Sequence, residues 1–307
     1  MDRLKKKLLV IGGTGFIGSH LCEAAIKNNY KVTSLSLSKV KNKIKKVKYF
    51  RIDISKEKNF KKIFNYPYDY VVNLSGYIEH KFFFDGGEKV IINHFDSLRK
   101  IILNLNKKKL KKFIQVGSSD EYGLNLAPQV ENMREIAFSP YSFAKIASTH
   151  FLQMLNKTEN FPCLILRPFI VYGPKQKNDR FLPNLILSCL LNKKFPTSEG
   201  KQLRDYCYID DIIDAILLFL KSNNKYNGEI FNIASGKPIK IIDIIKKVRR
   251  KIGNGRPVIG KMKLRKNENY KLFSNNKKIY KAISWRPKIN IDKGLDITID
   301  YYKKNYE

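Results

Sequence analysis

The sequence contains a tyrosine and a lysine whose types and spacing suit acid–base chemistry. Tyr141 and Lys145 lie four residues apart in the segment SPYSFAK, residues 139–145. Ser139 is a good N-cap and Pro140 suits the first helical position, so both side chains are expected on one helix face. An ammonium beside a phenol stabilises the phenolate and lowers the tyrosine pKa from about 10 towards neutrality. The pair is a candidate proton donor and acceptor; the alternative is an exposed helix pair without a function.

A glycine-rich turn near the N-terminus favours the catalytic interpretation. The turn GGTGFIG, residues 12–18, follows the apolar run Leu8–Ile11 and precedes a helical pattern from Ser19, and Tyr30–Leu35 has the character of a second strand. Strand, glycine turn, helix and strand in this order form the dinucleotide-binding βαβ unit. The glycines allow a close approach to pyrophosphate, and free N–H groups at the helix start attract the phosphates. We therefore expect a dinucleotide cofactor.

Strand and helix patterns alternate to about residue 170, which predicts an α/β fold with a doubly wound parallel sheet. The later strands are expected at residues 47–52, 70–74, 113–116 and 163–167. Ligands of such sheets bind beyond the carboxyl ends of the strands. Small or polar residues fall at those ends: Gly12, Asp53, Ser75 and Ser118.

The spacing of Gly12, Gly15 and Gly18, taken with the Tyr-x-x-x-Lys pair, resembles one family over nearly the whole chain. It is the extended short-chain dehydrogenase/reductase family, the NAD-dependent epimerase/dehydratases that act on nucleotide sugars. Further segments match it in order: VGSSDEYG (116–123), RPFIVYGP (167–174), RDYCYIDD (204–211), NIASG (232–236), WRP (285–287) and KGL (293–295).

The resemblance implies a Rossmann sheet with a smaller, interleaved C-terminal substrate domain. Residues 1–172 would form the dinucleotide-binding domain, with residues 206–233 returning to it. Residues 173–205 and 234–307 would bind the substrate. The family commonly forms homodimers through two helices per subunit, here about 90–105 and 139–155. Both segments carry apolar residues at helical spacing, although some of these must pack on the subunit's own sheet.

The resemblance also assigns roles to single residues. Tyr141 would exchange a proton with the sugar hydroxyl, Lys145 would hold the nicotinamide ribose, and Ser118 would hydrogen-bond the sugar oxygen. Other cofactor-binding residues would be Gly12, Gly15, Phe16, Ile17, Gly18, Ser36, Asp53, Ile54, Leu74 and Ser75. Substrate-binding residues would be Asn93, Ser119, Asp120, Arg204 and Arg265. Arg204 is the first candidate for the diphosphate; Arg265 has a surface ion pair as its alternative, and Asn93 a capping or core role.

Three departures from the family pattern bear on the reaction, the cofactor and the contacts to substrate. The 4,6-dehydratases carry Thr-Asp-Glu where this chain has Ser118-Ser119-Asp120. Removing water from a sugar needs an additional acid and base, and Ser119 cannot be that acid, which disfavours a dehydratase. Ser36 stands where NAD-selective relatives often carry Asp, so nothing there repels the 2′-phosphate of NADP. Ile170 replaces a common Asn, which removes one expected polar contact to substrate.

The sequence thus predicts a nucleotide-diphosphate-sugar oxidoreductase that uses NAD or NADP and acts at a ring carbon, C4. It would be a sugar 4-epimerase or a 4-ketosugar reductase, because both reactions use Ser118, Tyr141 and Lys145. Two alternatives stay open: a nucleotide-sugar 4,6-dehydratase, and a non-catalytic nucleotide-binding or RNA-binding scaffold of the same fold.

Composition adds expectations about partners. The formal net charge is +33 over 307 residues, but the lysines are scattered, which favours a general compositional bias over a nucleic-acid partner. No apolar run reaches the roughly 18 residues of a membrane span. A strand and a glycine turn follow the basic N-terminus, which argues against a signal peptide. The four cysteines lack metal spacing and are expected to be reduced and mostly buried, as in a cytoplasmic enzyme.

Overall fold

The computed structural model describes residues 5–40, 42–56, 61–264 and 268–306. The chain divides into two compact units. The first consists of Met1–Gly123, Arg134–Arg167 and Ile213–Phe231, and the second of Leu124–Met133, Pro168–Ile212 and Asn232–Glu307. Both units are therefore built from segments that are far apart in the sequence.

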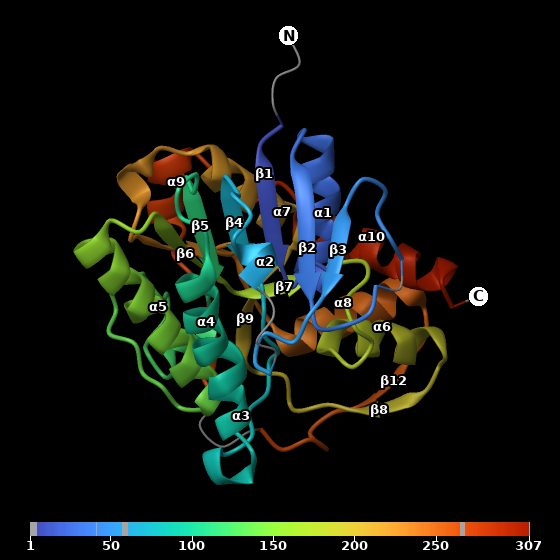
Figure 1. Cartoon of the computed structure of the whole chain (residues 1–307). Coiled ribbons are helices and arrows are strands. Elements are labelled where there is room, and N and C mark those ends of the chain that lie inside the picture. Colours follow the sequence, from blue (N-terminus) through green and yellow to red (C-terminus); the bar gives the residue numbers. More distant parts are fainter. Residues whose placement is uncertain (1–4, 41, 57–60, 265–267, 307) are drawn as a thin grey trace. The chain divides into compact units, whose positions relative to one another are not determined.

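A seven-stranded sheet organises the first unit (Figure 1). Its strands are β1 (Lys7–Ile11), β2 (Lys31–Ser36), β3 (Lys48–Arg51), β4 (Tyr70–Asn73), β5 (Lys112–Val116), β6 (Cys163–Pro168) and β10 (Ile230–Ile233). The order is β10-β6-β5-β4-β1-β2-β3, and the pairs from β3 to β6 are parallel. This confirms the predicted doubly wound α/β sheet. The strand order reverses between β1 and β4, where such sheets bind ligands.

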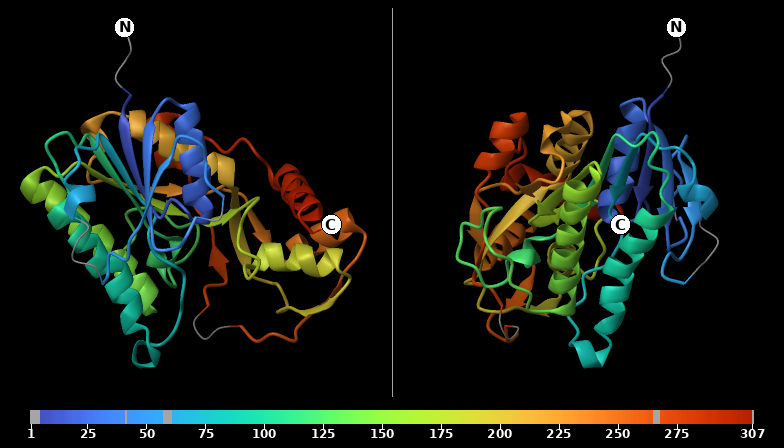
Figure 2. Two further views of the ribbon diagram at one scale, coloured as in Figure 1. Left: turned by 45° about the vertical axis from the view of Figure 1, so that its right-hand side comes forward. Right: turned by 60° about the vertical axis from the view of Figure 1, so that its left-hand side comes forward.

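Helices and short helical turns connect these strands. They are α1 (Phe16–Lys27), α2 (Lys61–Phe64), η1 (Phe83–Asp85), α3 (Glu88–Ile91), η2 (Ile92–Asp96), α4 (Ser97–Asn104), η3 (Ser119–Tyr122), α5 (Pro140–Glu159), α7 (Ile209–Lys221) and η4 (Asn224–Tyr226). The segment η2 is a π-helical turn between α3 and α4. This helical stretch runs beside α5, as Figure 2 shows.

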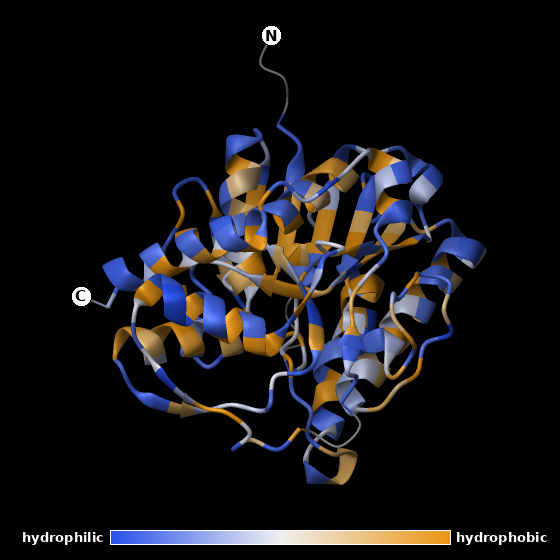
Figure 3. Ribbon diagram, turned by 180° about the vertical axis from the view of Figure 1, so that it is seen from behind, coloured by the Kyte–Doolittle hydropathy of each residue, from blue (hydrophilic) through white to orange (hydrophobic). Residues whose placement is uncertain are grey.

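Burial on both faces fixes the sheet of the first unit. Leu8, Leu9 and Val10 of β1 are fully buried, as parallel strands between two helical layers require. Figure 3 shows the same division, with apolar strands and helices banded in polar and apolar residues. Because the interior is close-packed, the carboxyl ends of the strands are held in fixed positions.

Within its described residues, the second unit has smaller sheets and four helices of its own. Its strands are β7 (Ile170–Tyr172), β8 (Lys194–Pro196), β9 (Leu203–Tyr208), β11 (Pro238–Lys240), β12 (Arg256–Val258) and β13 (Lys271–Leu272). Its helices are α6 (Phe181–Leu190), α8 (Ile241–Ile252), α9 (Lys277–Ile283) and α10 (Ile291–Lys304). The strand β9 pairs with β7 and β13 in parallel and with β11 antiparallel, while β12 pairs with β8. The assignment of this unit to substrate binding stays a prediction.

Two buried carboxylates explain the later sequence motifs in structural terms. Asp205 accepts the backbone N–H groups of Ser235 at 2.6 Å and Gly236 at 2.9 Å. Asp211 accepts those of Lys288 at 2.8 Å and Ile289 at 3.0 Å. The RDYCYIDD segment therefore holds the NIASG segment and the chain after WRP in place within the second unit.

Two further expectations concern the state of the cysteines and the presence of membrane-spanning helices. Cys22, Cys163, Cys189 and Cys207 are all free and buried. Among the residues that the structure describes, no helix combines the length and apolar character that crossing a bilayer requires.

Candidate active site

Tyr141 and Lys145 lie one turn apart on the buried face of α5. The helix begins where expected, because the Ser139 side chain accepts the N–H of Ser142 at 3.1 Å. The Lys145 Nζ lies 5.8 Å from the centroid of the Tyr141 ring. It also donates a hydrogen bond of 2.9 Å to the carbonyl of Val116. The predicted pair is therefore adjacent, and its lysine reaches the end of β5.

The surroundings of Lys145 set its charge. Burial lowers the pKa of Lys145 from 10.5 to about 8, while the charges of Glu121 and then Asp120 raise it. The ammonium is therefore the main form at pH 7. A buried cation beside a phenol is the arrangement that stabilises a phenolate.

Ser118 lies two residues beyond the end of β5, whose last carbonyl, that of Val116, is the one that Lys145 contacts. It has an extended backbone, and its hydroxyl accepts the N–H of Asp120 at 3.1 Å as the N-cap of η3. The structure thus brings Ser118, Tyr141 and Lys145 together at the carboxyl end of β5 in the first unit.

Two histidines that sequence reasoning did not single out flank the tyrosine. The Tyr141 ring meets His94 edge-on at a centroid distance of 5.3 Å and His80 at 5.8 Å. The Nε2 of His80 lies 3.8 Å from a carboxylate oxygen of Asp120. A single histidine carries no spacing signal, so neither position could be recognised from the sequence pattern.

His94 lies on the π-helical turn η2, and such turns often occur at functional sites. Its Nε2 lies 3.0 Å from the carbonyl oxygen and 3.2 Å from the backbone nitrogen of Tyr77. Burial, followed by the charge of Lys145, lowers the pKa of His94 to about 3, so the imidazole is neutral. The neighbouring Asn93, a predicted substrate residue, donates to the Tyr77 hydroxyl at 3.1 Å. Together Asn93 and His94 hold the segment after β4 beside Tyr141.

The glycine-rich turn fits a dinucleotide pyrophosphate. Gly12 has a φ of +84°, and a Cβ there would lie 2.8 Å from the carbonyl oxygen of Leu74. A Cβ on Gly18 would collide with the Gly12 carbonyl. The first turn of α1 follows Gly15, which supplies no side-chain cap, so its N–H groups can bind phosphate oxygens. The predicted Phe16 and Ile17 open this helix.

The other predicted cofactor residues follow the ends of neighbouring strands in the first unit. Ser36 ends β2, and its hydroxyl accepts the N–H of Thr14 in the glycine turn at 3.1 Å. Asp53 follows β3, beside the buried Ile54, and accepts the N–H of Ser55 at 3.0 Å. Leu74 and Ser75 follow β4 in the same way. Their predicted contacts with the cofactor stay predictions.

The predicted substrate residues are distributed over both units. Ser119 is buried in η3, next to Asp120. Arg204 belongs to the second unit, where its guanidinium forms an ion pair of 2.7 Å with Glu268. Arg265 lies outside the described residues. A role for Arg204 at a diphosphate would require it to share or exchange this carboxylate partner.

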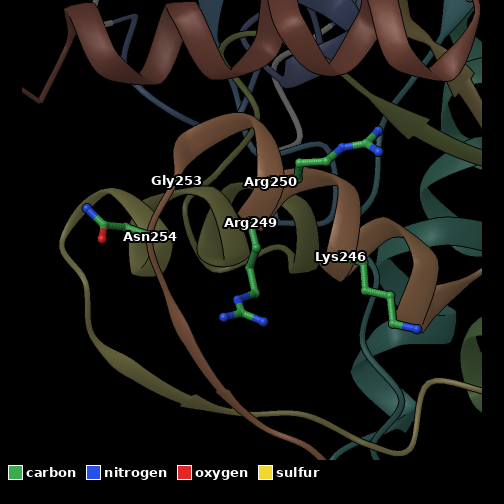
Figure 4. Close-up of a pocket in the computed structure, with 5 residues that line it drawn as sticks. All are labelled: Lys246, Arg249, Arg250, Gly253 and Asn254. Carbon is green, nitrogen blue, oxygen red and sulfur yellow. The ribbon is translucent and has the colours of Figure 1, made fainter.

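A basic recess in the second unit is separate from these residues. Figure 4 shows Lys246, Arg249, Arg250, Gly253 and Asn254 around it, at the end of α8. It contains none of the predicted site residues. Arg249 and Arg250 are exposed cations in the last turn of α8, where they are ordinary partners of the helix dipole, and Lys246 is an exposed side chain one turn earlier, so the recess carries no assignment.

Comparisons with known proteins show the family of the chain. The model of the NAD-dependent epimerase/dehydratase family matches residues 8–234. A putative UDP-glucose 4-epimerase of Methanocaldococcus jannaschii is 28% identical, over 97% of this chain and 99% of that protein. A dTDP-D-glucose 4,6-dehydratase of Dictyostelium discoideum is 30% identical over 80% of this chain, but the match spans only 62% of that protein.

A solved structure shares the fold over almost the full length. The Bacillus cereus UDP-glucuronic acid 4-epimerase, in complex with UDP-glucuronic acid and NAD, has a TM-score of 0.89 and 27% identity. The match covers 98% of this chain and 100% of that one. With the family model spanning most of the sequence, the chain belongs to the NAD-dependent epimerase/dehydratase family.

Proposed function

We propose that the protein is an NAD(P)-dependent oxidoreductase of nucleotide-diphosphate sugars that acts at C4, as a 4-epimerase or a 4-ketosugar reductase. The observation that carries the proposal is the placement of Tyr141 and Lys145 on one buried helix face, at the strand end that bears Ser118. A non-catalytic scaffold would have no need for all three groups. The glycine cradle in the same unit supports a cofactor site.

The chain's own residues would move one proton. Tyr141, as a phenolate beside the Lys145 ammonium, accepts the proton of the C4 hydroxyl, and Ser118 hydrogen-bonds the same oxygen. The nicotinamide ring, when bound, supplies the redox chemistry at the sugar carbon. In an epimerase Tyr141 then returns this proton to the C4 oxygen. In a reductase Tyr141 instead begins as the phenol and donates its proton to the C4 oxygen, so the same residues serve either reaction.

A 4,6-dehydratase is the second candidate, because of the contact between His80 and Asp120. Elimination of water needs a further acid and base beyond the tyrosine. Asp120 is a carboxylate that can serve as the base, whereas Ser119 cannot serve as the acid. The imidazole of His80, 3.8 Å from Asp120 and edge-on to Tyr141, is an ionisable group that could take that part.

Product analysis separates these functions. The purified protein is incubated with UDP- and dTDP-hexoses, and with 4-ketosugars plus NADPH or NADH, and the products are identified by NMR. Inverted C4 with no net change in NAD(P)H absorbance indicates an epimerase, while stoichiometric consumption indicates a reductase. A 4-keto-6-deoxy product indicates the dehydratase. No turnover with any sugar, despite cofactor binding, would contradict the proposal and favour a scaffold.

A further inference from the structure

Glu121 is a fully buried carboxylate whose bonds connect the site to its framework. One oxygen, Oε1, accepts the backbone N–H of Ser118 at 2.8 Å. The other, Oε2, accepts the hydroxyl of Thr149 at 2.8 Å and the Nε of Arg167 at 2.9 Å. Thr149 lies on α5, one turn after Lys145, and Arg167 lies on β6. One side chain therefore joins η3, α5 and β6 at the point where Ser118 stands.

The packing around this carboxylate is tight. A Cβ on Gly117 would collide with the Oε1 of Glu121, so the residue before Ser118 must be small for the carboxylate to reach the Ser118 N–H. Ser118 and Glu121 also form a reciprocal capping box, which fixes the start of η3. Ser118 is thus held by its own side chain and by Glu121.

Arg167 has two carboxylate partners. Its Nη2 lies 2.7 Å from Glu121 and 2.6 Å from Glu135, and its side chain is fully buried. Two carboxylates and one guanidinium leave one negative charge in this cluster. Because Arg167 is shared by two carboxylates, it does not fully neutralise the charge of Glu121. A buried charge is costly unless it is compensated, so Glu121 also favours a positive charge on its other neighbours.

Lys145 is a second cation close to Glu121, because its Nζ bonds the carbonyl of Val116 and Glu121 bonds the N–H of Ser118, two residues further along the same strand end. The ionisable side chains around Lys145 are Tyr141 on its own helix, Asp120 and Glu121 on η3, and the neutral His94 on η2. Burial opposes the lysine's charge, and Glu121 is the stronger of the two carboxylates that favour it. The same carboxylate thus acts on both Ser118 and Lys145.

We propose that Glu121 is a positioning residue of the site: its Oε1 fixes the backbone of Ser118, and its buried negative charge keeps Lys145 an ammonium beside Tyr141. The inference rests on the proposed function for the roles of Ser118 and Lys145 in catalysis. The competing explanation is that Glu121 is only a counterion for Arg167. A second carboxylate on the same guanidinium, Glu135, allows the two explanations to be compared. Glu135 pairs with the same guanidinium but is not among the charges that act on Lys145.

The first test measures the charge of Lys145 without any substrate. Wild type, Glu121→Gln and Glu135→Gln are labelled with acetic anhydride over a pH series, and acetylation of the Lys145 peptide is quantified by mass spectrometry. Wild type should titrate near pH 8. The midpoint should fall by roughly one pH unit in Glu121→Gln, the usual effect of losing a nearby opposite charge, and stay in Glu135→Gln. Equal midpoints in all three proteins would overturn the proposal.

Two controls separate the effect of the Glu121 charge from a loss of stability and from a change in the position of the carboxylate. Both Gln variants weaken the Arg167 ion pairs, so their melting temperatures should fall together, whereas a counterion role alone gives no difference in lysine labelling. Glu121→Asp keeps the charge but retracts the carboxylate from the Ser118 N–H, and it serves if Glu121→Gln does not fold. It should keep the wild-type labelling midpoint and lower kcat at least about tenfold, the scale of a disturbed catalytic geometry. Wild-type kcat in Glu121→Asp would contradict the positioning of Ser118.

Turnover gives the second readout. Since the ammonium is lost as pH rises through its pKa, kcat should decline above about pH 8 in wild type and at lower pH in Glu121→Gln. If wild type converts no nucleotide sugar, the proposed function fails. The labelling experiment still decides the role of Glu121 in that case.

Discussion

At the scale of single residues, the site depends on one phenol and the charges around it. Tyr141 contacts His80, His94 and Lys145, and two of these neighbours have pKa values that burial has lowered. The sequence pattern identified Tyr141 and Lys145 because they share one helix turn. It could not identify His94, because a single histidine has no spacing signal. It could not identify the role of Glu121 either, because its partner Arg167 lies 46 residues further along the chain.

Replacing the phenol tests its role directly. Tyr141→Phe keeps the ring that packs on His94 but removes the exchangeable proton, so kcat should fall at least about a hundredfold, the usual scale for losing a general acid–base group. Cofactor affinity, measured by calorimetry, should stay within a few-fold of wild type. Turnover at the wild-type rate would remove Tyr141 from the mechanism.

His94 predicts a specific acid sensitivity. Its pKa is about 3 when folded, against an ordinary 6.5, so below pH 6.5 the unfolded chain binds a proton that the folded chain does not. Stability is therefore lost as pH falls from 6.5 towards 3, by about 2 kcal/mol at pH 5. His94→Phe has no titrating ring, and its urea-unfolding free energy should change less between pH 7 and 5. A parallel decline in both proteins would show that His94 is not the source.

At the scale of elements, the sequence predicted those features that depend on neighbouring residues alone. The end of β1 follows from its apolar run, the turn before α1 from its glycines, and the start of α5 from the Ser139 cap. The π-helical turn was not predictable, because residues 90–105 have ordinary helical spacing and tertiary contacts decide the extra residue. The roles of Asp205 and Asp211 also needed the structure, since their partners are distant segments.

The contact between β2 and the glycine turn carries a prediction about the cofactor. Ser36 ends β2 and already bonds the turn through Thr14, so it lies beside the dinucleotide cradle without a negative charge. NADP(H) should therefore bind as well as NAD(H) or better. Ser36→Asp should shift preference to NAD(H), because the carboxylate repels a 2′-phosphate. Calorimetric titration of both cofactors decides this, and a strong wild-type preference for NAD(H) would refute it.

At the scale of the whole molecule, the net charge of +33 predicts how fast the protein captures an anionic substrate. Scattered lysines raise the general attraction for anions, and nucleotide sugars carry a diphosphate. Substrate capture, measured as kcat/KM, should therefore slow as ionic strength rises, since exposed charges are screened within about 8–10 Å at physiological salt. An unchanged kcat/KM would show that the scattered lysines do not attract the substrate.

The last prediction concerns pairing of two subunits through α5 and the helical segment before it. Much of the expected apolar stripe packs inside the subunit, where Leu98, Ile101 and Ile102 are buried and Phe95 meets Phe151 at 5.9 Å. Other apolar side chains of the same elements are left exposed: Ile92, Leu103, Phe143 and Met154. An isologous dimer would bury such side chains on both subunits at once.

We therefore expect a homodimer that forms through α5 and weakens when its exposed side chains become charged. Phe143→Glu with Met154→Glu should give monomers, while Leu218→Glu, an exposed apolar position on α7, should leave the dimer intact. Multi-angle light scattering at micromolar concentrations measures both. A wild-type mass near 36 kDa, that of the 35.8 kDa chain, would overturn the prediction, because it would show that solvent covers these side chains.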